Sequence, residues 1–204
     1  MPRPNQSDAK RREFLPVVAR AFAELGYRRT TTAQLAARCG VQENILYRLW
    51  PDKKAMFIAS IEYLFDLSAS IWGKLLAEDA GDRTTAELLL AYEAEHIGEF
   101  GNQRIIFAGL SETDDPQIRA ALAGMYQSYH RFVREQIAAH QARRGKAGGG
   151  RGGGKEIDAT LLAWAVIGLG TVTTIARELD ILGDRPRKRL MSEVGGLMLK
   201  GRTA

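Results

Sequence analysis

Hydrogen-bonding side chains follow a glycine turn in the first quarter of the chain. Gln42, Glu43 and Asn44 come directly after a Gly-Val pair, and Tyr47 and Arg48 lie about one helical turn later. If these residues begin a helix, their amide and carboxylate groups stand at its leading end, where a recognition helix meets base edges in the major groove of DNA. The free backbone N–H groups of that first turn also favour a phosphate. The residue types therefore favour contact with DNA.

The same side chains also have ordinary structural interpretations. Glu43 either accepts a hydrogen bond from cytosine or pairs with Arg48 or a nearby lysine. Tyr47 alone is typical of a core tyrosine, and Arg48 and Lys53 alone are typical of solvated surface charges. Lys53 begins the next helix, however, where its charge and the free backbone amides can hold a phosphate. The joint placement of these residues around the turn favours the DNA interpretation.

Three helices must position these residues. Apolar residues spaced four, four and three positions apart predict a first helix over residues 8–25, ended by Gly26. Thr31 is a good N-cap for a second helix, because Gln34 three residues later completes a capping box. A third short helix follows the Gly-Val turn and is closed by Pro51. Two short helices joined in this way fit a helix-turn-helix.

The rest of the sequence has helical periodicity and no strand-like alternation. It predicts an all-α protein of about nine helices, with a three-helix helix-turn-helix domain over residues 1–55 and a helical bundle domain over residues 56–204. The helices expected in the bundle begin at Pro51 or Asp52 and then cover about residues 83–99, 103–110, 116–143, 156–179 and 185–201.

Two features near the end of the chain predict a loop and a dimer. Residues 145–154 contain seven glycines, so we expect a flexible loop there. Its basic residues could touch nucleic acid, but a linker is the simpler interpretation. The helix over residues 156–179 is apolar around most of its circumference and needs neighbours on every side. A homodimer through the last two helices supplies them, and burial within one subunit is the alternative.

The positive charge is concentrated at the beginning of the chain. Residues 1–54 contain eleven basic and five acidic residues, whereas the other 150 residues contain eighteen basic and nineteen acidic residues. This asymmetry suggests a polyanion-binding head on a neutral body. A solvated basic surface has the same composition, so charge alone does not decide between the two.

Composition argues against several other classes of protein. The single cysteine, Cys39, excludes a disulfide framework and is most simply a small buried hydrophobe. The histidines lack metal-ligand spacing and no nucleophile motif or nucleotide fingerprint occurs, so we expect no enzyme activity, no metal and no cofactor. No run of 18 apolar residues and no apolar leader occur, so we expect no membrane span, no secretory signal and a cytoplasmic location.

The segment GYRRTTTAQLAARCGVQENILYRLWPDKKAMF closely resembles the DNA-binding domain of the TetR family of bacterial transcriptional repressors. The matching positions keep a fixed spacing over about a sixth of the chain. The chain departs from the family pattern at Asn44, where glycine or proline is frequent, and at Leu49, where histidine is frequent. The matching features are Gly26-Tyr27, Thr30-Thr31, Leu35-Ala36, Gly40-Val41, Leu46-Tyr47, Trp50 and Lys53.

The resemblance implies a function and a set of contacts. It implies a homodimeric repressor that binds a palindromic operator in double-stranded DNA and responds to a small-molecule effector, for which we expect an apolar or amphipathic compound. A non-specific architectural DNA-binding protein and a helical enzyme are the alternatives. By the resemblance, Thr31, Thr32, Tyr47 and Lys53 contact phosphates, and Gln42, Glu43, Asn44, Ile45 and Arg48 face the bases.

TetR-like proteins usually carry the effector pocket in the helical body. Large aromatic and sulfur side chains there are candidates for its lining, although most such residues belong to the core. Glu93 or Glu95 could line the same cavity beside His96. The candidates are Phe65, Trp72, Tyr92, His96, Phe107, Met125, Tyr126, Tyr129 and Trp164.

Overall fold

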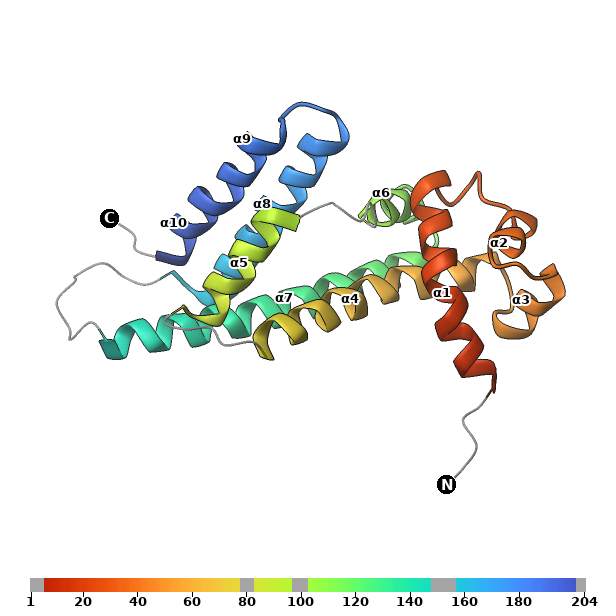
Figure 1. Ribbon diagram of the computed structural model, residues 1–204, viewed down its shortest axis with the longest axis horizontal. Helices are drawn as coiled ribbons and strands as arrows, with labels where there is room; N and C mark the ends of the chain where they lie inside the picture. The colour runs from red at the N-terminus through yellow and green to blue at the C-terminus, as the bar shows by residue number, and fades with distance from the viewer. Residues whose placement is uncertain (1–5, 78–82, 97–102, 148–156, 201–204) are drawn as a thin grey trace, which may run out of the picture. The chain divides into compact units, whose positions relative to one another are not determined.

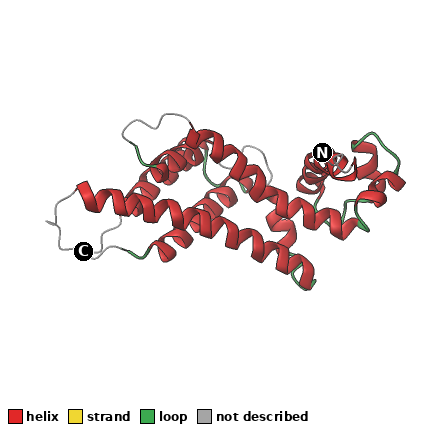
Figure 2. Cartoon of the chain, turned by 90° about the horizontal axis from the view of Figure 1, so that it is seen from below, coloured by secondary structure: helices red, strands yellow, loops and turns green. Residues whose placement is uncertain are grey.

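The computed structural model describes residues 6–77, 83–96, 103–147 and 157–200. Within these ranges every regular element is a helix (Figure 2), which confirms the predicted all-α class. The chain divides into two compact units, each made of two stretches of sequence. The N-terminal unit comprises Met1–Ser68 and Phe100–Tyr126, and the C-terminal unit comprises Ala69–Glu99 and Gln127–Ala204.

The first helix, α1 (Gln6–Leu25), begins two residues before its predicted start and ends where predicted (Figure 1). Phe14, Val18 and Phe22 are buried, as their helical spacing predicts. Gly26 then has a φ of +76°, a left-handed conformation that strains residues with a side chain. The chain therefore leaves α1 through a turn that requires glycine.

The helices α2 (Thr32–Arg38) and α3 (Glu43–Leu49) form the predicted pair of short helices. The capping box is present: the Thr31 hydroxyl accepts a hydrogen bond from the Gln34 N–H at 3.2 Å, and the Gln34 side chain accepts one from the Thr31 N–H at 2.9 Å. Between the two helices Gly40 has a φ of +68°. Local sequence signals therefore account for both the start of α2 and the turn into α3.

The core of the N-terminal unit holds these helices together. Leu35 of α2 and Leu46 of α3 are fully buried, and both helices contact α1. Phe57 packs against two aromatic rings, with centroid distances of 5.0 Å to Phe22 and 4.7 Å to Tyr27. Burial of such large apolar side chains is the main term that stabilises this unit.

Aspartates begin two of the longer helices. The Asp52 carboxylate accepts a hydrogen bond from the Ala55 N–H at 2.7 Å at the start of α4 (Lys53–Ala77). The Asp115 carboxylate accepts one from the Gln117 N–H at 2.9 Å at the start of α7 (Pro116–Ala147). Both arrangements are N-caps that satisfy otherwise free backbone N–H groups.

The glycine-rich segment differs in part from the expected loop. The helix α7 continues through Gly145 to Ala147, four residues past its predicted end. The remainder of the predicted loop, residues 148–154, lies outside the described residues.

The C-terminal unit contains α5 (Thr85–His96) and α8 (Ala159–Glu178), both near their predicted positions. Its last helical run consists of α9 (Asp184–Arg189), the π-turn η1 (Leu190–Val194) and α10 (Gly195–Lys200). This run contacts α5 and α8 (Figure 1). The remaining helix, α6 (Arg104–Leu110), belongs to the N-terminal unit. If the last helical run is counted as one helix, the described chain has nine helices, as predicted.

A buried histidine connects the elements of the C-terminal unit. His140 is 3% exposed, and its Nδ1 lies 2.7 Å from the Thr84 hydroxyl. Its Nε2 lies 3.1 Å from the Leu199 carbonyl oxygen, to which Arg144 also donates at 3.1 Å. These bonds satisfy a terminal carbonyl group of α10, as basic side chains often do at helix C-termini. The apolar core beside them comprises Ala86, Ile137, Leu162, Ala163 and Leu199.

One face of α8 stays exposed although it is apolar. Leu161, Trp164, Val172, Ile175 and the C-cap residue Leu179 are between 37% and 67% exposed and recur at the spacing of a single helical face. Burial within one subunit therefore does not account for the apolar character of α8. By length and composition α4 and α8 could each cross a membrane, but core helices of soluble proteins pass the same test, so the expectation of no membrane span stays a prediction.

Candidate nucleic-acid interface

The helix α3 and its N-cap present polar side chains that lack partners in the described chain. Gln42 is the N-cap residue, yet its side chain forms no capping hydrogen bond. Gln42, Glu43, Asn44 and Arg48 are all exposed, and none of their side chains has a hydrogen bond or ion pair within the described residues. Four neighbouring groups able to donate or accept hydrogen bonds are therefore available to an outside partner.

The ion-pair interpretation of Glu43 does not hold within the part of the chain that the structure describes. Neither Arg48 nor a lysine there forms an ion pair with Glu43. Its carboxylate stays exposed in the first turn of α3, where a negative charge interacts favourably with the helix dipole. The contact with cytosine stays a prediction.

Several other cations of the N-terminal unit, by contrast, already have partners. Arginine and lysine side chains that are paired within the protein are less available to a phosphate than Arg48 is. The paired groups are Arg11 with the Leu49 carbonyl at 2.7 Å, Arg28 with Glu112 at 2.7 Å, Arg38 with Glu24 at 2.5 Å and Lys54 with Asp115 at 3.0 Å.

Hydroxyl groups join α2 to α3 at the surface. The Tyr47 hydroxyl donates to the Thr32 hydroxyl at 3.0 Å, and Tyr47 is 47% exposed. The interpretation of Tyr47 as a core residue is therefore wrong. Thr31 lies next to Thr32 as the N-cap of α2. The structure thus brings together three of the four residues for which the resemblance implies phosphate contacts.

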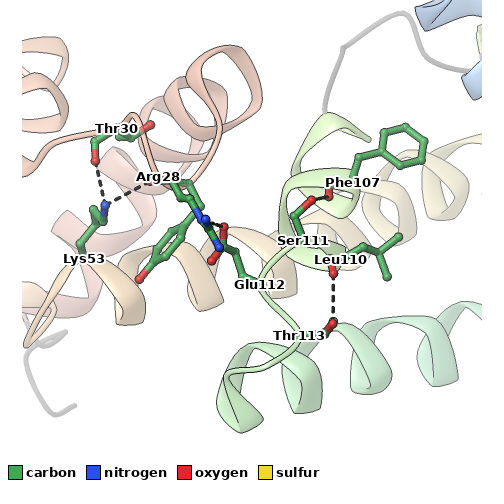
Figure 3. Close-up of polar contacts among 9 residues, drawn as sticks. Arg28, Thr30, Lys53, Phe107, Leu110, Ser111, Glu112 and Thr113 are labelled. Atoms are coloured by element: carbon green, nitrogen blue, oxygen red, sulfur yellow. Dashed lines mark hydrogen bonds and ion pairs between the residues drawn. The ribbon is translucent and has the colours of Figure 1, made fainter.

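Lys53, the fourth of these residues, is held within the protein. Its ammonium group donates to the Thr30 carbonyl at 3.0 Å (Figure 3). It also donates to the Tyr27 carbonyl at 3.1 Å. It also lies 4.5 Å from the centre of the Tyr27 ring, a cation–π contact. These bonds use two of its three N–H groups, which leaves one for a phosphate. Lys53 therefore also organises the segment between α1 and α2.

Two ion pairs that the sequence did not reveal connect this part of the unit to the segment between α6 and α7. Arg28 pairs with Glu112 at 2.7 Å (Figure 3), and Lys54 pairs with Asp115 at 3.0 Å. The hydrogen bond from Lys54 holds the pKa of the Asp115 carboxyl below its usual value. The partners are 84 and 61 residues apart, so no local pattern could have shown them.

Two smaller side chains near the turn are partly buried. Ile45, for which the resemblance implies contact with bases, has only part of its surface exposed. Cys39 is also partly buried, and burial raises the pKa of its thiol. A raised pKa favours the unreactive thiol over the thiolate, in line with a packing role for Cys39.

Some of the candidate effector-pocket residues come together in the C-terminal unit. The rings of Trp72 and Tyr129 are 5.6 Å apart, and those of Tyr92 and His96 are 4.4 Å apart. Sequence analysis missed Phe132, whose ring stacks on Trp72 at 4.6 Å. Its position three residues after Tyr129 on α7 is the helical spacing that could have revealed it.

The other candidates lie elsewhere. Trp164 is 46% exposed on α8 and stacks on His130 at 4.5 Å. No group of three histidine, cysteine, aspartate or glutamate residues within the described ranges is arranged to hold a metal ion. Phe65, Phe107, Met125 and Tyr126 belong to the N-terminal unit.

The sequence of this interface matches a known family. The family described as "Bacterial regulatory proteins, tetR family" matches residues 17–60, which contain the whole of α2 and α3. The nucleoid occlusion factor SlmA of Photobacterium profundum is 25% identical over 169 residues, which cover 80% of this chain and 81% of that protein.

Solved structures show the same fold. A TetR-family transcriptional regulator from Cytophaga hutchinsonii superposes with a TM-score of 0.76 over 98% of both chains, at 18% identity. A transcriptional regulator from Saccharomonospora viridis, solved in complex with choline, gives a TM-score of 0.73 at 18% identity and covers 91% of this chain and 95% of its own.

Proposed function

Because the chain belongs to the TetR family of bacterial regulatory proteins, we propose that it is a sequence-specific transcriptional repressor that binds a palindromic operator as a homodimer. In this proposal residues 1–55 bind DNA, and residues 56–204 bind an effector and dimerise. The observation that carries it is a set of exposed side chains of α3 without partners in the described chain, with Gln42, Glu43 and Asn44 at the leading end and Arg48 in the last turn.

The helix α3 enters the major groove with this end inward. Its amide, carboxylate and guanidinium groups form hydrogen bonds with base edges and thereby select the operator sequence. Thr31, Thr32 and Tyr47, with the remaining N–H group of Lys53, bind backbone phosphates and set the register of the helix. Ile45 contributes an apolar contact at the same surface.

The exposed apolar face of α8 forms the centre of the dimer interface, together with the last helical run. Covering Leu161, Val172 and Leu179, which are 56–67% exposed, removes apolar surface from water. Two-fold symmetry then presents two copies of α3 to half-sites one helical turn apart, or a multiple of that distance.

A small apolar or amphipathic effector binds in the helical body and releases the protein from DNA. The neighbouring structure in complex with choline supports a small-molecule ligand for this fold. Within the N-terminal unit, ion pairs join the segment between α6 and α7 to Arg28, in the turn between α1 and α2, and to Lys54, at the start of α4. We assign no enzymatic activity, metal or cofactor to the protein and place it in the cytoplasm with its DNA.

A second candidate is a DNA-binding factor that acts on the nucleoid as a whole. It is favoured by the name of the relatives, nucleoid occlusion factor SlmA, at 25% identity over most of the chain. Such a factor would occupy many sites across a chromosome, whereas a repressor occupies a few sites beside promoters.

Sequencing the genomic fragments that the purified full-length protein captures tests both candidates. A few strongly enriched palindromes beside promoters support the repressor, and many dispersed copies of one palindrome support the nucleoid factor. Capture without any enriched sequence contradicts both and leaves non-specific binding. Affinity for the enriched site should also fall steeply with salt concentration, because phosphate contacts release counterions.

A further inference from the structure

A carboxylate lies among aromatic rings in the C-terminal unit. Glu93 of α5 accepts a hydrogen bond at 2.8 Å from the indole N–H of Trp72, which belongs to α4. Phe132 of α7 stacks on Trp72 with a centroid distance of 4.6 Å and an interplanar angle of 16°. Tyr129 of α7 approaches the same indole edge-on at 5.6 Å. Residues from three helices therefore converge on one small region.

The basic neighbour of Glu93 is His96, three residues later on α5, and not a lysine or an arginine of the described chain. The only hydrogen bond of Glu93 comes from Trp72, and neither lysine nor arginine forms an ion pair with it within the described residues. Burial raises the pKa of Glu93, while the bond from Trp72 and the charge of His96 oppose that rise. A partly buried carboxylate without a cation is costly. An ion pair with lysine or arginine usually offsets this cost in a protein. A buried carboxylate without such a pair, such as Glu93, is therefore a candidate for a functional site.

The cluster is accessible at its rim. Trp72 is buried, with 6% of its surface exposed, whereas Glu93, Tyr129 and Phe132 are only partly buried. The exposed parts of Glu93 and of the two outer rings are therefore the positions at which a ligand can meet the cluster. Tyr92 and His96, in ring contact at 4.4 Å, flank Glu93 on α5.

The chemistry of this region selects a cation that also has apolar groups. Aromatic rings attract ammonium ions through their negative faces, and a nearby carboxylate adds a full negative charge. An inorganic cation prefers several oxygen ligands, whereas Glu93 is the single carboxylate among the described residues of this cluster. A neutral or anionic compound leaves the charge of Glu93 unpaired.

We infer that Glu93, Trp72, Tyr129 and Phe132 form a binding site for an organic ammonium ion, quaternary or bearing bulky alkyl groups. The role of this ion as effector rests on the proposed function, whereas the binding itself does not. The inference narrows the expected amphipathic effector to a positively charged class.

A matched pair of probes tests the charge requirement. Choline and 3,3-dimethylbutan-1-ol have nearly the same shape, but the alcohol has carbon in place of the charged nitrogen. Calorimetric titration of the full-length protein should show saturable binding of choline, or of the larger benzyltrimethylammonium ion, and at least about tenfold weaker binding of the alcohol. Equal binding of choline and the alcohol, or no binding of either cation, overturns the inference.

A matched pair of variants tests the site. Glu93→Gln keeps a hydrogen-bond acceptor for Trp72 but removes the charge, and it should weaken cation binding about tenfold or more. Glu95→Gln removes the same charge two residues away, where Glu95 is exposed and paired with Lys188, and it should leave binding unchanged. Equal effects of the two variants contradict the site. If Glu93→Gln fails to fold, Phe132→Leu replaces it and should weaken cation binding while leaving the folded helix content unchanged.

A parallel gel shift separates this inference from the proposed function. Glu93→Gln should bind the captured operator as the unchanged protein does, but it should no longer be released by the cation. Specific operator binding without any cation binding contradicts only the inference. Cation binding by a protein that selects no DNA sequence contradicts the proposed repressor.

Discussion

The hydroxyl of Tyr47 donates a hydrogen bond to the hydroxyl of Thr32 at 3.0 Å and joins the exposed surfaces of α2 and α3. The resemblance implies phosphate contacts for both residues, and they are fifteen positions apart in the sequence. Their contact brings one hydroxyl group of each helix to one place, so a single stretch of DNA backbone could meet both.

Tyr47→Phe should weaken binding to every DNA sequence by a similar factor, because the proposed function assigns its hydroxyl to a phosphate and not to a base. The hydrogen bond is exposed, so its loss should change the free energy of unfolding by no more than about 1 kcal/mol. Gel shifts with operator and random DNA measure the first effect, and urea unfolding measures the second. A loss confined to the operator would show that Tyr47 reads bases.

Gln42→Ala and Arg48→Ala should change sequence preference, because each removes a side chain to which the proposed function assigns a base contact. Each lost base contact should cost about 1–3 kcal/mol on the operator and relax discrimination at one position of each half-site. Competition binding with single-base variants of the operator measures this. Arg119→Ala is the matched control: it removes the same charge from an exposed position on α7 in the same unit, and it should leave sequence preference unchanged.

Gly40→Ala should destabilise the turn between α2 and α3. Gly40 has a φ of +68°, which costs a residue with a Cβ about 1–2 kcal/mol. Gly73→Ala provides the contrast, because Gly73 lies inside α4 with open space around its Cβ position and alanine favours a helix by about 1 kcal/mol. In thermal unfolding, the melting temperature of Gly40→Ala should be lower than that of the unchanged protein. The melting temperature of Gly73→Ala should be equal or higher. The reverse order would contradict the left-handed turn.

Glu93 and Glu87 should affect stability with opposite pH dependence. Burial raises the pKa of Glu93. Its contribution to the free energy of unfolding is therefore fully present below the usual glutamate pKa, and it is lost as the pH rises through the raised pKa. The advantage of Glu93→Gln in melting temperature should therefore grow from acidic to neutral pH.

Hydrogen bonds from Thr84 lower the pKa of Glu87. The contribution of Glu87 to the free energy of unfolding is present above the usual glutamate pKa, and it is lost as the pH falls through the lowered pKa. Glu87→Gln should therefore be less stable than the unchanged protein at neutral pH and approach it in acid. A parallel response of the two variants would contradict the environments assigned to these carboxyl groups.

Local signals in the sequence predicted most of the helices. Gly26, the pair of Thr31 with Gln34, and Gly40 each act over four residues or fewer, so their consequences could be inferred without knowledge of the fold. Pairings between distant residues could not. Arg28 meets Glu112, and Lys53 turns toward the carbonyls of Tyr27 and Thr30, because packing brings separate segments together.

The same distinction applies to the candidate sites. The types and spacing of Gln42, Glu43, Asn44 and Arg48 identified them in the sequence, and the structure adds that their side chains lack partners within the described residues. The contact of Glu93 with Trp72 joins α5 to α4 across 21 positions. Glu93 and Glu95 were equivalent candidates in the sequence, and only the packing of the helices distinguishes the two.

The most direct test of sequence reading by α3 is to compare the DNA sequences selected from a random pool by the unchanged protein and by Arg48→Ala. The unchanged protein should enrich a palindrome whose half-sites are one helical turn apart or a multiple of that distance. The variant should enrich the same palindrome, but without a preferred base at one position of each half-site. Selection of the same sequence by both proteins with only a lower yield for the variant, or selection of no sequence by either, would contradict base recognition by α3.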